Sequence, residues 1–228
     1  MPTIISKIIR DQIALLLFKP FKSQIQESWV AYLSWGLLIT WIVGTGRYWD
    51  HPNADWWQYL GLGSVAYVFI LAFIVWIIAA PLKPRHWSYL NVLIFITLTS
   101  LPALLYAIPV EQFMILQNAQ SANFWFLLIV AVWRVALFLN FLRKVAGLNP
   151  IEVTVTGLLP LVLIVTTLTV LNLEHVVFQI MGGIRNPTQH DTAYLALITI
   201  TYFSLLLSPV LLIWYGVLIY KKNTSSSN

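Results

Sequence analysis

Six long apolar stretches dominate the hydrophobic pattern of the chain, and short polar connections separate them. A membrane-spanning helix needs about 20 mainly apolar residues, because the hydrocarbon core is roughly 30 Å thick and each residue rises about 1.5 Å. The stretches show no alternation with a period of two, which favours helices over β-barrel strands. The pattern predicts an all-α polytopic membrane helix bundle over residues 26–220. Its six transmembrane helices are approximately Trp29–Thr45, Trp57–Ala80, Ser88–Ile108, Asn123–Leu142, Val153–Leu173 and Ala193–Tyr220.

The first 25 residues carry an amphipathic pattern instead. Apolar side chains recur there at helical spacing, at Ile5, Ile8, Ile9, Ile13 and Leu16. This spacing predicts an interfacial helix on the cytoplasmic face of the membrane; the alternative is the start of the first span. At the other end, residues 221–228 are polar and are predicted to form a disordered cytoplasmic tail.

The composition agrees with a membrane protein. Apolar residues make up 59% of the 228 and charged residues 9%, which is too little charge to cover the surface of a water-soluble domain. Cysteine is absent, so a disulfide scaffold is excluded. No basic stripe with interleaved aromatic residues is present, which argues against nucleic acid as a partner.

The basic residues indicate an orientation. Cytoplasmic loops of membrane proteins are enriched in Lys and Arg. The side of the predicted bundle opposite to both termini has only Arg47 and Arg185. Both termini are therefore predicted to be cytoplasmic, and the short, cysteine-free chain is compatible with a bacterial inner membrane. Ten basic residues lie on the side of the termini: Lys7, Arg10, Lys19, Lys22, Lys83, Arg85, Arg143, Lys144, Lys221 and Lys222.

Arg134 is the one charged residue inside a predicted span. A guanidinium within the membrane costs at least a few kcal/mol and usually faces the bundle interior, where it finds a partner. Proline residues within three spans free backbone carbonyls that are candidate partners, at Leu98, Thr156 and Leu205. Two interpretations stay open: an anion or lipid-headgroup site, and a structural hydrogen-bond hub.

Small and hydroxyl-bearing residues mark two helix faces. Gly36, Thr40 and Gly44 form a strip along the first span that favours close helix approach. On the last span a polar seam, formed by Thr201, Ser204 and Ser208, should point inward. We treat these three hydroxyls as interhelical contacts first and as ligand-binding residues, together with Arg134, second.

A second candidate site gathers titratable side chains on the outer face. Carboxylate and imidazole groups bind zinc and other divalent ions, and the same groups can act as acid and base. No compact metal-binding motif joins them, so the alternative is a solvated acidic surface. The candidate metal ligands are Asp50, His51, Glu174, His175, His190 and Asp191.

Three functional hypotheses follow. The first is a non-catalytic multi-pass protein that binds lipid or assembles with a membrane-protein partner or a second copy of itself. The second is a transporter or lipid-handling permease centred on Arg134. The third is a metal-assisted membrane enzyme that uses the outer His, Asp and Glu residues. No motif assigns a catalytic residue or a specific cofactor.

Overall fold

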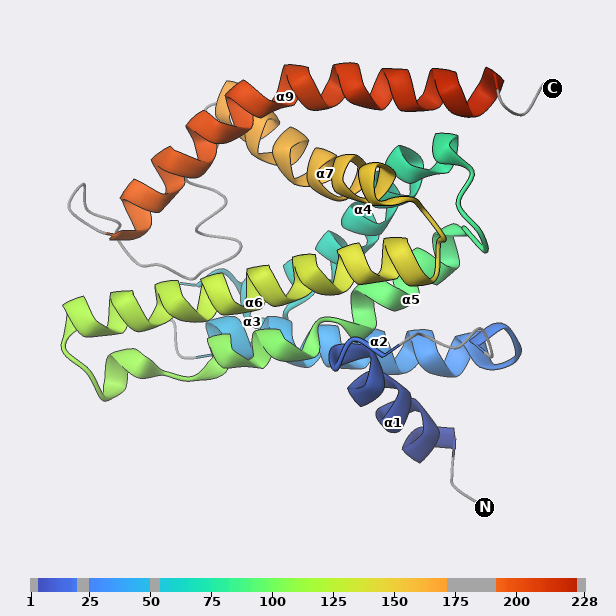
Figure 1. Cartoon of the computed structure of the whole chain (residues 1–228). Helices are drawn as coiled ribbons and strands as arrows, with labels where there is room; N and C mark the ends of the chain where they lie inside the picture. The colour runs from blue at the N-terminus through green and yellow to red at the C-terminus, as the bar shows by residue number, and fades with distance from the viewer. Residues whose placement is uncertain (1–3, 20–24, 50–53, 172–191, 225–228) are drawn as a thin grey trace.

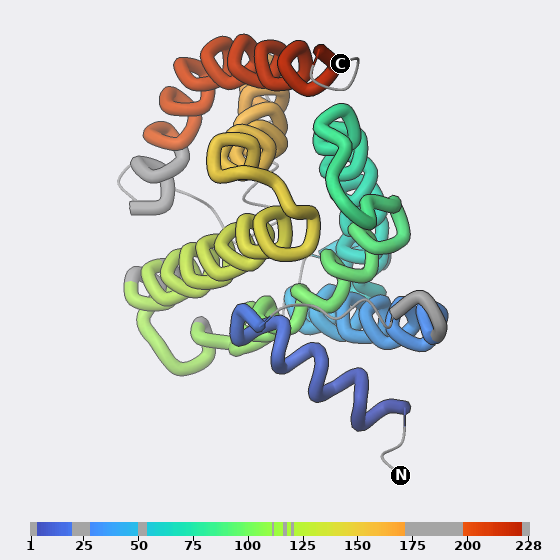
Figure 2. The backbone as a smooth tube through the Cα atoms, turned by 45° about the vertical axis from the view of Figure 1, so that its right-hand side comes forward, coloured from blue at the N-terminus to red at the C-terminus, as the bar shows by residue number. Residues whose placement is uncertain are grey.

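The computed structural model describes residues 4–19, 25–49, 54–171 and 192–224, and all regular structure in these residues is helical. The elements are α1 (Ile4–Leu16), α2 (Ile25–Tyr48), α3 (Trp56–Tyr59), α4 (Leu62–Ala79), η1 (Ala80–Leu82), α5 (Tyr89–Leu98), η2 (Leu101–Ala107), η3 (Val110–Gln112), α6 (Leu116–Lys144), α7 (Pro150–Val170) and α9 (Thr192–Thr224). Helices α2, α4, α5, α6, α7 and α9 form the bundle, and α1 lies along its edge at an angle to α2 (Figures 1 and 2).

Within the described residues, five helices are long and apolar enough to cross a membrane. Helices α5 and η2 meet at a bend of 42°, and together they bring the number to six if the pair is one broken span rather than a re-entrant loop. We call this bent pair the third crossing, from its place in the chain. The prediction of a polytopic helical membrane bundle is therefore confirmed. The second predicted span is shorter than expected, because Gly61 adopts a left-handed conformation and separates α3 from α4. The last helix is longer than expected and reaches Thr224, four residues into the predicted tail.

The prolines break or bend three of the predicted spans. Pro102 stands at the start of η2, where the α-helix of the third crossing gives way to a tighter 3₁₀ helix. Proline lacks the N–H that would continue the α-helical hydrogen bonds. Pro160 and Pro209 lie inside α7 and α9, and Figure 1 shows α9 bent along its length.

Helix α1 ends at Leu16, is separate from α2 and docks against the bundle. Its place at the cytoplasmic membrane interface stays a prediction. Helix α1 buries Ile8, Gln12 and Leu15, whereas Ile5 and Ile13 of the predicted apolar face are exposed. The Gln12 amide donates to the Leu98 carbonyl (2.8 Å), and its oxygen accepts from the Trp35 indole (2.8 Å). Its docked face therefore combines apolar contacts with one buried amide that is bonded through both its nitrogen and its oxygen.

The small-residue strip of α2 is a helix-packing face. A side chain added at Gly36 would collide with Thr97 of α5, and one added at Gly44 would meet the turn at Gly61. Between them, the Thr40 hydroxyl lies 3.0 Å from the Ser100 hydroxyl. The strip therefore brings α2 against the bent third crossing and the start of α4, as the sequence predicts.

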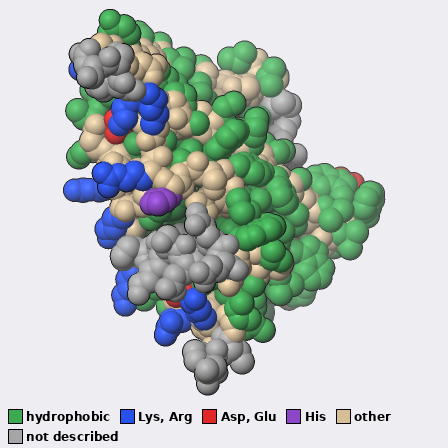
Figure 3. Space-filling model, turned by 90° about the vertical axis from the view of Figure 1, so that its right-hand side faces the viewer, with side chains coloured by type: hydrophobic (Ala, Val, Ile, Leu, Met, Phe, Trp, Pro, Cys, Tyr) green, Lys and Arg blue, Asp and Glu red, His purple; other side chains and the backbone are tan. Residues whose placement is uncertain are grey.

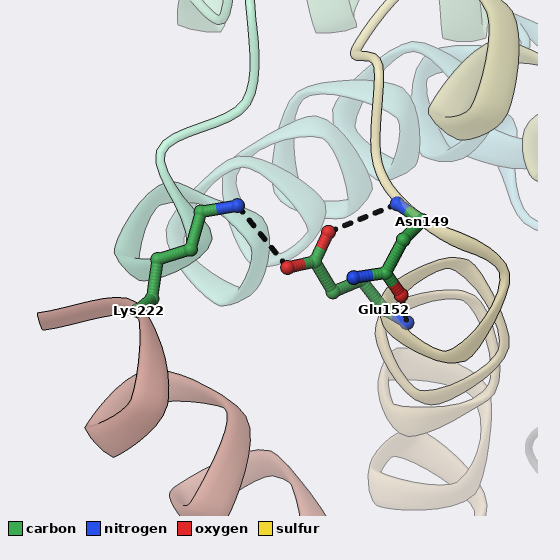
Figure 4. A network of polar contacts seen from close by, with 3 residues as sticks. All are labelled: Asn149, Glu152 and Lys222. Atoms are coloured by element: carbon green, nitrogen blue, oxygen red, sulfur yellow. Dashed lines mark hydrogen bonds and ion pairs between the residues drawn. The ribbon is translucent and has the colours of Figure 1, made fainter. Parts of the chain in front are cut away.

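A buried carboxylate joins α7 to α9 near the ends of both helices (Figure 4). Glu152 accepts a hydrogen bond from the backbone N–H of Asn149 (3.0 Å) and forms an ion pair with Lys222 (3.1 Å). The Asn149 side chain in turn accepts from the backbone N–H of Glu152 (3.0 Å). This capping box satisfies the start of α7, and the negative charge lies where the helix dipole favours it.

Basic side chains gather on one face of the molecule, which Figure 3 views directly. The backbone N–H of Arg85 bonds to the Ala146 carbonyl (2.9 Å), which joins the η1–α5 loop to the α6–α7 loop. The Lys144 ammonium bonds to the Phe18 carbonyl (3.2 Å), which adds the end of α1. We call this surface the basic face, defined by Lys19, Lys83, Arg85, Arg143, Lys144, Lys221 and Lys222.

Candidate functional site

A cavity of about 180 Å³ lies inside the bundle, lined by residues from α2, α3, α4, α5, η2, α6 and α7. Arg47 and Arg134 belong to its wall. Within residues 26–220, they are the two described arginines that lie away from the basic face. We call this space the arginine cavity. Its main polar lining residues are Arg47, Tyr48, Gln58, Ser64, Tyr106 and Arg134.

Arg47 reaches the cavity because α2 continues through Tyr48. The expected first span ended before Arg47 and placed it in an outer loop, so that boundary is corrected. Thr40, Gly44 and Arg47 stand at i, i+4 and i+7, so the small-residue face of α2 ends on this arginine. The Arg47 guanidinium lies over the Tyr106 ring, 4.9 Å from its centroid, and hydrogen-bonds with the Tyr48 side chain.

Arg134 faces the same cavity from α6. It lies ten residues before the end of that helix at Lys144, about 15 Å along the axis. Among the described residues its guanidinium has no hydrogen-bond partner. It is close enough to Arg47 for the two positive charges to repel, and close enough to Tyr106 for an electrostatic interaction.

The proline-freed carbonyls do not serve as the partners that the sequence suggested. The Leu98 carbonyl accepts from Gln12 of α1 (2.8 Å). The Leu205 carbonyl accepts from the Ser208 hydroxyl of its own helix (3.3 Å). No hydrogen bond joins the carbonyl of the fully buried Thr156 to Arg134 among the described residues, and the Thr156 hydroxyl has no partner there either. None of these three groups bonds to Arg134 in the described structure.

The described wall of the cavity contains no carboxylate. Two arginines thus share one interior space without an acidic residue from the described part of the chain to neutralise them. Each such charge is costly within a membrane, and the cost rises when two of the same sign are close. Chemically, the site offers two guanidinium groups and several hydroxyl and amide donors, which is the donor set of an oxyanion site.

The polar seam of α9 lies elsewhere. Thr201, Ser204 and Ser208 do not line the arginine cavity. Ser204 is buried, and it shares a helix face with Leu211 and Tyr215, which pack against α7. Their ligand-binding role stays a prediction, and the structure separates them from Arg134.

The six candidate metal ligands, Asp50, His51, Glu174, His175, His190 and Asp191, lie outside the described residues. Within the described residues, no group of three or more His, Cys, Asp or Glu side chains is arranged to hold a metal ion. The outer metal site therefore stays a prediction.

The sequence singled out Arg134 but missed the second arginine and the tyrosines around it. One signal was present, since Arg47 continues the periodicity of Thr40 and Gly44 on α2. The contribution of Tyr106 had no such signal, because it depends on the bend between α5 and η2. Comparisons with protein-family models, with curated proteins and with solved structures found no match.

Proposed function

We propose that this membrane protein binds an anionic molecule through Arg47 and Arg134, without catalysing a reaction. The observation that carries the proposal is that both guanidinium groups line one cavity whose described wall has no carboxylate. Guanidinium groups hold carboxylate and phosphate oxygens through paired, charge-assisted hydrogen bonds. An anion between the two arginines relieves their mutual repulsion and supplies the acceptors that Arg134 lacks among the described residues.

Desolvation strengthens this interaction. The arginine cavity is enclosed by apolar helices, where the effective dielectric constant is far below that of water. A ligand without charge can accept hydrogen bonds from the two arginines but gains no ion-pair attraction, and it leaves the repulsion between them uncompensated. The site therefore selects for negative charge before it selects for shape.

The protein is proposed to be a multi-pass protein of a bacterial cytoplasmic membrane with both termini in the cytoplasm. The support is the basic face, because Lys and Arg are enriched on the cytoplasmic side of membrane proteins. The lining residues Arg47 and Tyr48 come from the end of α2 that is farthest from the basic face. In this orientation the polar end of the arginine cavity lies toward the outer leaflet.

Transport is a second candidate function, favoured by the broken third crossing. Thr99 and Ser100 stand at the break between α5 and η2, and both line the arginine cavity. Interrupted helices at a central binding site are a feature of many secondary transporters. Uptake of an anionic ligand into proteoliposomes, lost in Arg134→Gln, would distinguish transport from binding alone.

The test of the binding function compares two arginines of the same helix. Arg134→Gln removes the cavity charge, whereas Arg143→Gln removes an exposed charge of the basic face. We expect anionic vesicles of phosphatidylglycerol, or a soluble alkyl phosphate, to raise the thermal midpoint of the wild type and of Arg143→Gln. Arg134→Gln should lose that stabilisation, with binding weakened by about tenfold or more. A folded Arg134→Gln protein that binds as the wild type does would overturn the proposal.

A further inference from the structure

The shape and polarity of the arginine cavity point to a particular class of ligand. We propose that the ligand is an amphiphile, with an oxyanion head held by Arg47 and Arg134 and an apolar chain in the deeper part of the cavity. The inference rests on the proposed anion-binding function and adds the chain and the route of entry. The ligand enters from the leaflet opposite the basic face.

The polarity of the cavity wall changes with depth along α4, which runs toward the basic face. Ser64 and Tyr67 line its first part, and Leu71 and Val75 line its second part. From Ser64 to Val75 the helix advances about 16 Å, which is half the thickness of a hydrocarbon core. The cavity thus reaches from the polar end deep into the membrane, and only its first part offers polar side chains on this helix.

Two other elements also place an aromatic side chain at the deep end, although α6 has apolar lining residues, Val130 and Ala131, on the outer side of Arg134 as well. On the third crossing Tyr106 lines the polar end and Phe95 lines the deep end. On α6, Arg134 is followed one turn deeper by Phe138. Apolar side chains from separate helices therefore converge at the same depth, which favours a hydrocarbon chain over a second polar group.

Hydroxyl groups in the middle of the cavity are already bonded within the protein. Thr40 donates to the Gly36 carbonyl (2.8 Å), and Thr99 donates to the Ile96 carbonyl (2.9 Å). Ser100 lies within hydrogen-bond distance of both Thr40 and the Ile96 carbonyl. These groups do not need a ligand, so among the described lining residues the charged donors for an oxyanion are the two arginines at the polar end.

Two lining residues also belong to the outer surface of the molecule. Trp57, at the polar end, is 39% exposed, and tryptophan is enriched at membrane interfaces. Leu161, near the middle of the α7 span, is 37% exposed and faces lipid rather than water at that depth. The cavity wall therefore borders the bilayer beside both the head and the chain. A lipid-borne amphiphile fits this arrangement better than an anion that arrives from water.

The experiment measures binding of dodecyl phosphate and of ethyl phosphate, which share a head group and differ in chain length. The full-length protein is used in an uncharged maltoside detergent. Leu71→Trp fills the deep part of the cavity, and its control is Ile70→Trp on the exposed side of the same helix. We expect Leu71→Trp to weaken dodecyl phosphate binding by about tenfold, because overpacking costs roughly 1–3 kcal/mol. Ethyl phosphate binding should change little in Leu71→Trp, and Ile70→Trp should affect neither probe.

A second pair on α6 keeps the test decisive if Leu71→Trp does not fold. Val135→Phe projects into the cavity, and Val132→Phe lies on the exposed side of the same helix. Laurate in place of dodecyl phosphate distinguishes a carboxylate head from a phosphate head. Dodecyltrimethylammonium, with the same chain and a positive head, should not bind.

The possible failures are distinguishable. If Arg47→Gln and Arg134→Gln bind dodecyl phosphate normally, the proposed anion-binding function is wrong, and the chain inference fails with it. If the arginine variants lose binding while Leu71→Trp and Val135→Phe bind dodecyl phosphate as their controls do, only the chain inference is wrong. The protein would then bind an anion without enclosing its tail.

Discussion

The α7–α9 junction and the arginine cavity differ in whether a buried charge has an opposite charge beside it among the described residues. At the junction, Glu152 is buried and has a backbone donor from Asn149 and an ion pair with Lys222. In the cavity, Arg47 and Arg134 repel each other, and no described lining residue carries a negative charge. The first arrangement is complete within the described residues, whereas the described wall of the arginine cavity supplies no negative charge beside its two arginines.

The contact between α1 and the bundle resembles the α7–α9 junction, because its buried polar side chain has partners within the protein. Gln12 bonds through both ends of its amide, to the Leu98 carbonyl and to the Trp35 indole. Gln12, like Glu152, therefore has its partners within the protein across long sequence separations. The arginine cavity differs from both of these arrangements, because no acidic residue lines the part of its wall that the structure describes.

The largest effect is expected when a negative charge is placed in the arginine cavity itself. Arg134→Glu places a carboxylate in the cavity with Arg47 and brings the charge of the pair to zero. We expect dodecyl phosphate binding to fall by about a hundredfold, as for loss of a buried charge pair at the low end of the usual range. The ligand-free protein should unfold at a higher temperature than the wild type, because an attraction replaces a repulsion.

Thermal denaturation with and without ligand measures both effects, with Arg143→Glu on the basic face as the control. Retained ligand binding in Arg134→Glu would show that the cavity charge does not attract the ligand. A lower thermal midpoint for ligand-free Arg134→Glu would show that Arg134 already has a favourable environment in the protein.

The next largest effect is a loss of stability on substitution of Gln12, whose amide is bonded through both its nitrogen and its oxygen. Gln12→Leu leaves the Leu98 carbonyl and the Trp35 indole without their partner, which should cost about 2 kcal/mol of the free energy of unfolding. Unfolding in mixed detergent micelles measures the change, and Ile13→Leu on the exposed side of α1 is the control. An equal result for the two variants would mean that α1 does not cap the broken crossing in the membrane.

A smaller effect is expected at Glu152. Glu152→Gln keeps the side-chain shape and an acceptor for the Asn149 N–H but removes the ion pair with partly exposed Lys222. The loss should be about 1 kcal/mol, and Glu152→Ala should lose roughly 1 kcal/mol more because the capping box is removed as well. Unfolding of both variants under the same conditions checks the order, and equal stabilities would show that the ion pair and the cap are not separate contributions.

The smallest effect is expected at Tyr106, which supports Arg47 within the cavity. Tyr106→Leu removes the ring under the guanidinium, a cation–π contact worth about 0.5–1 kcal/mol, so dodecyl phosphate binding should weaken by roughly two- to fivefold. Tyr106→Phe keeps the ring and should bind nearly as the wild type does. Titration of both variants with the same probe measures the difference. Equal weakening in the two variants would assign the role to the phenol hydroxyl instead.

Much of the architecture could be predicted because it depends on local pattern. The apolar stretches indicated the crossings, since a lipid environment requires each segment to satisfy its own backbone. The spacing of Gly36, Thr40 and Gly44 indicated a close helix contact, which α2 makes with α5 and the turn at Gly61. The end of the first span was predicted too early, because a charged residue such as Arg47 interrupts the apolar pattern even where the helix continues.

The sequence by itself determined the class of protein, the helical crossings, the segregation of basic residues to one face and the presence of Arg134 inside a span. Hydropathy, proline placement and charge position act locally, so each is readable along the chain. Only the tertiary structure decided that Arg47 joins Arg134, that Gln12 rather than an arginine bonds to the Leu98 carbonyl, and that the α9 hydroxyls lie elsewhere. These outcomes depend on which helix faces meet and where the third crossing bends, and such distances between remote residues are set by packing of the whole bundle.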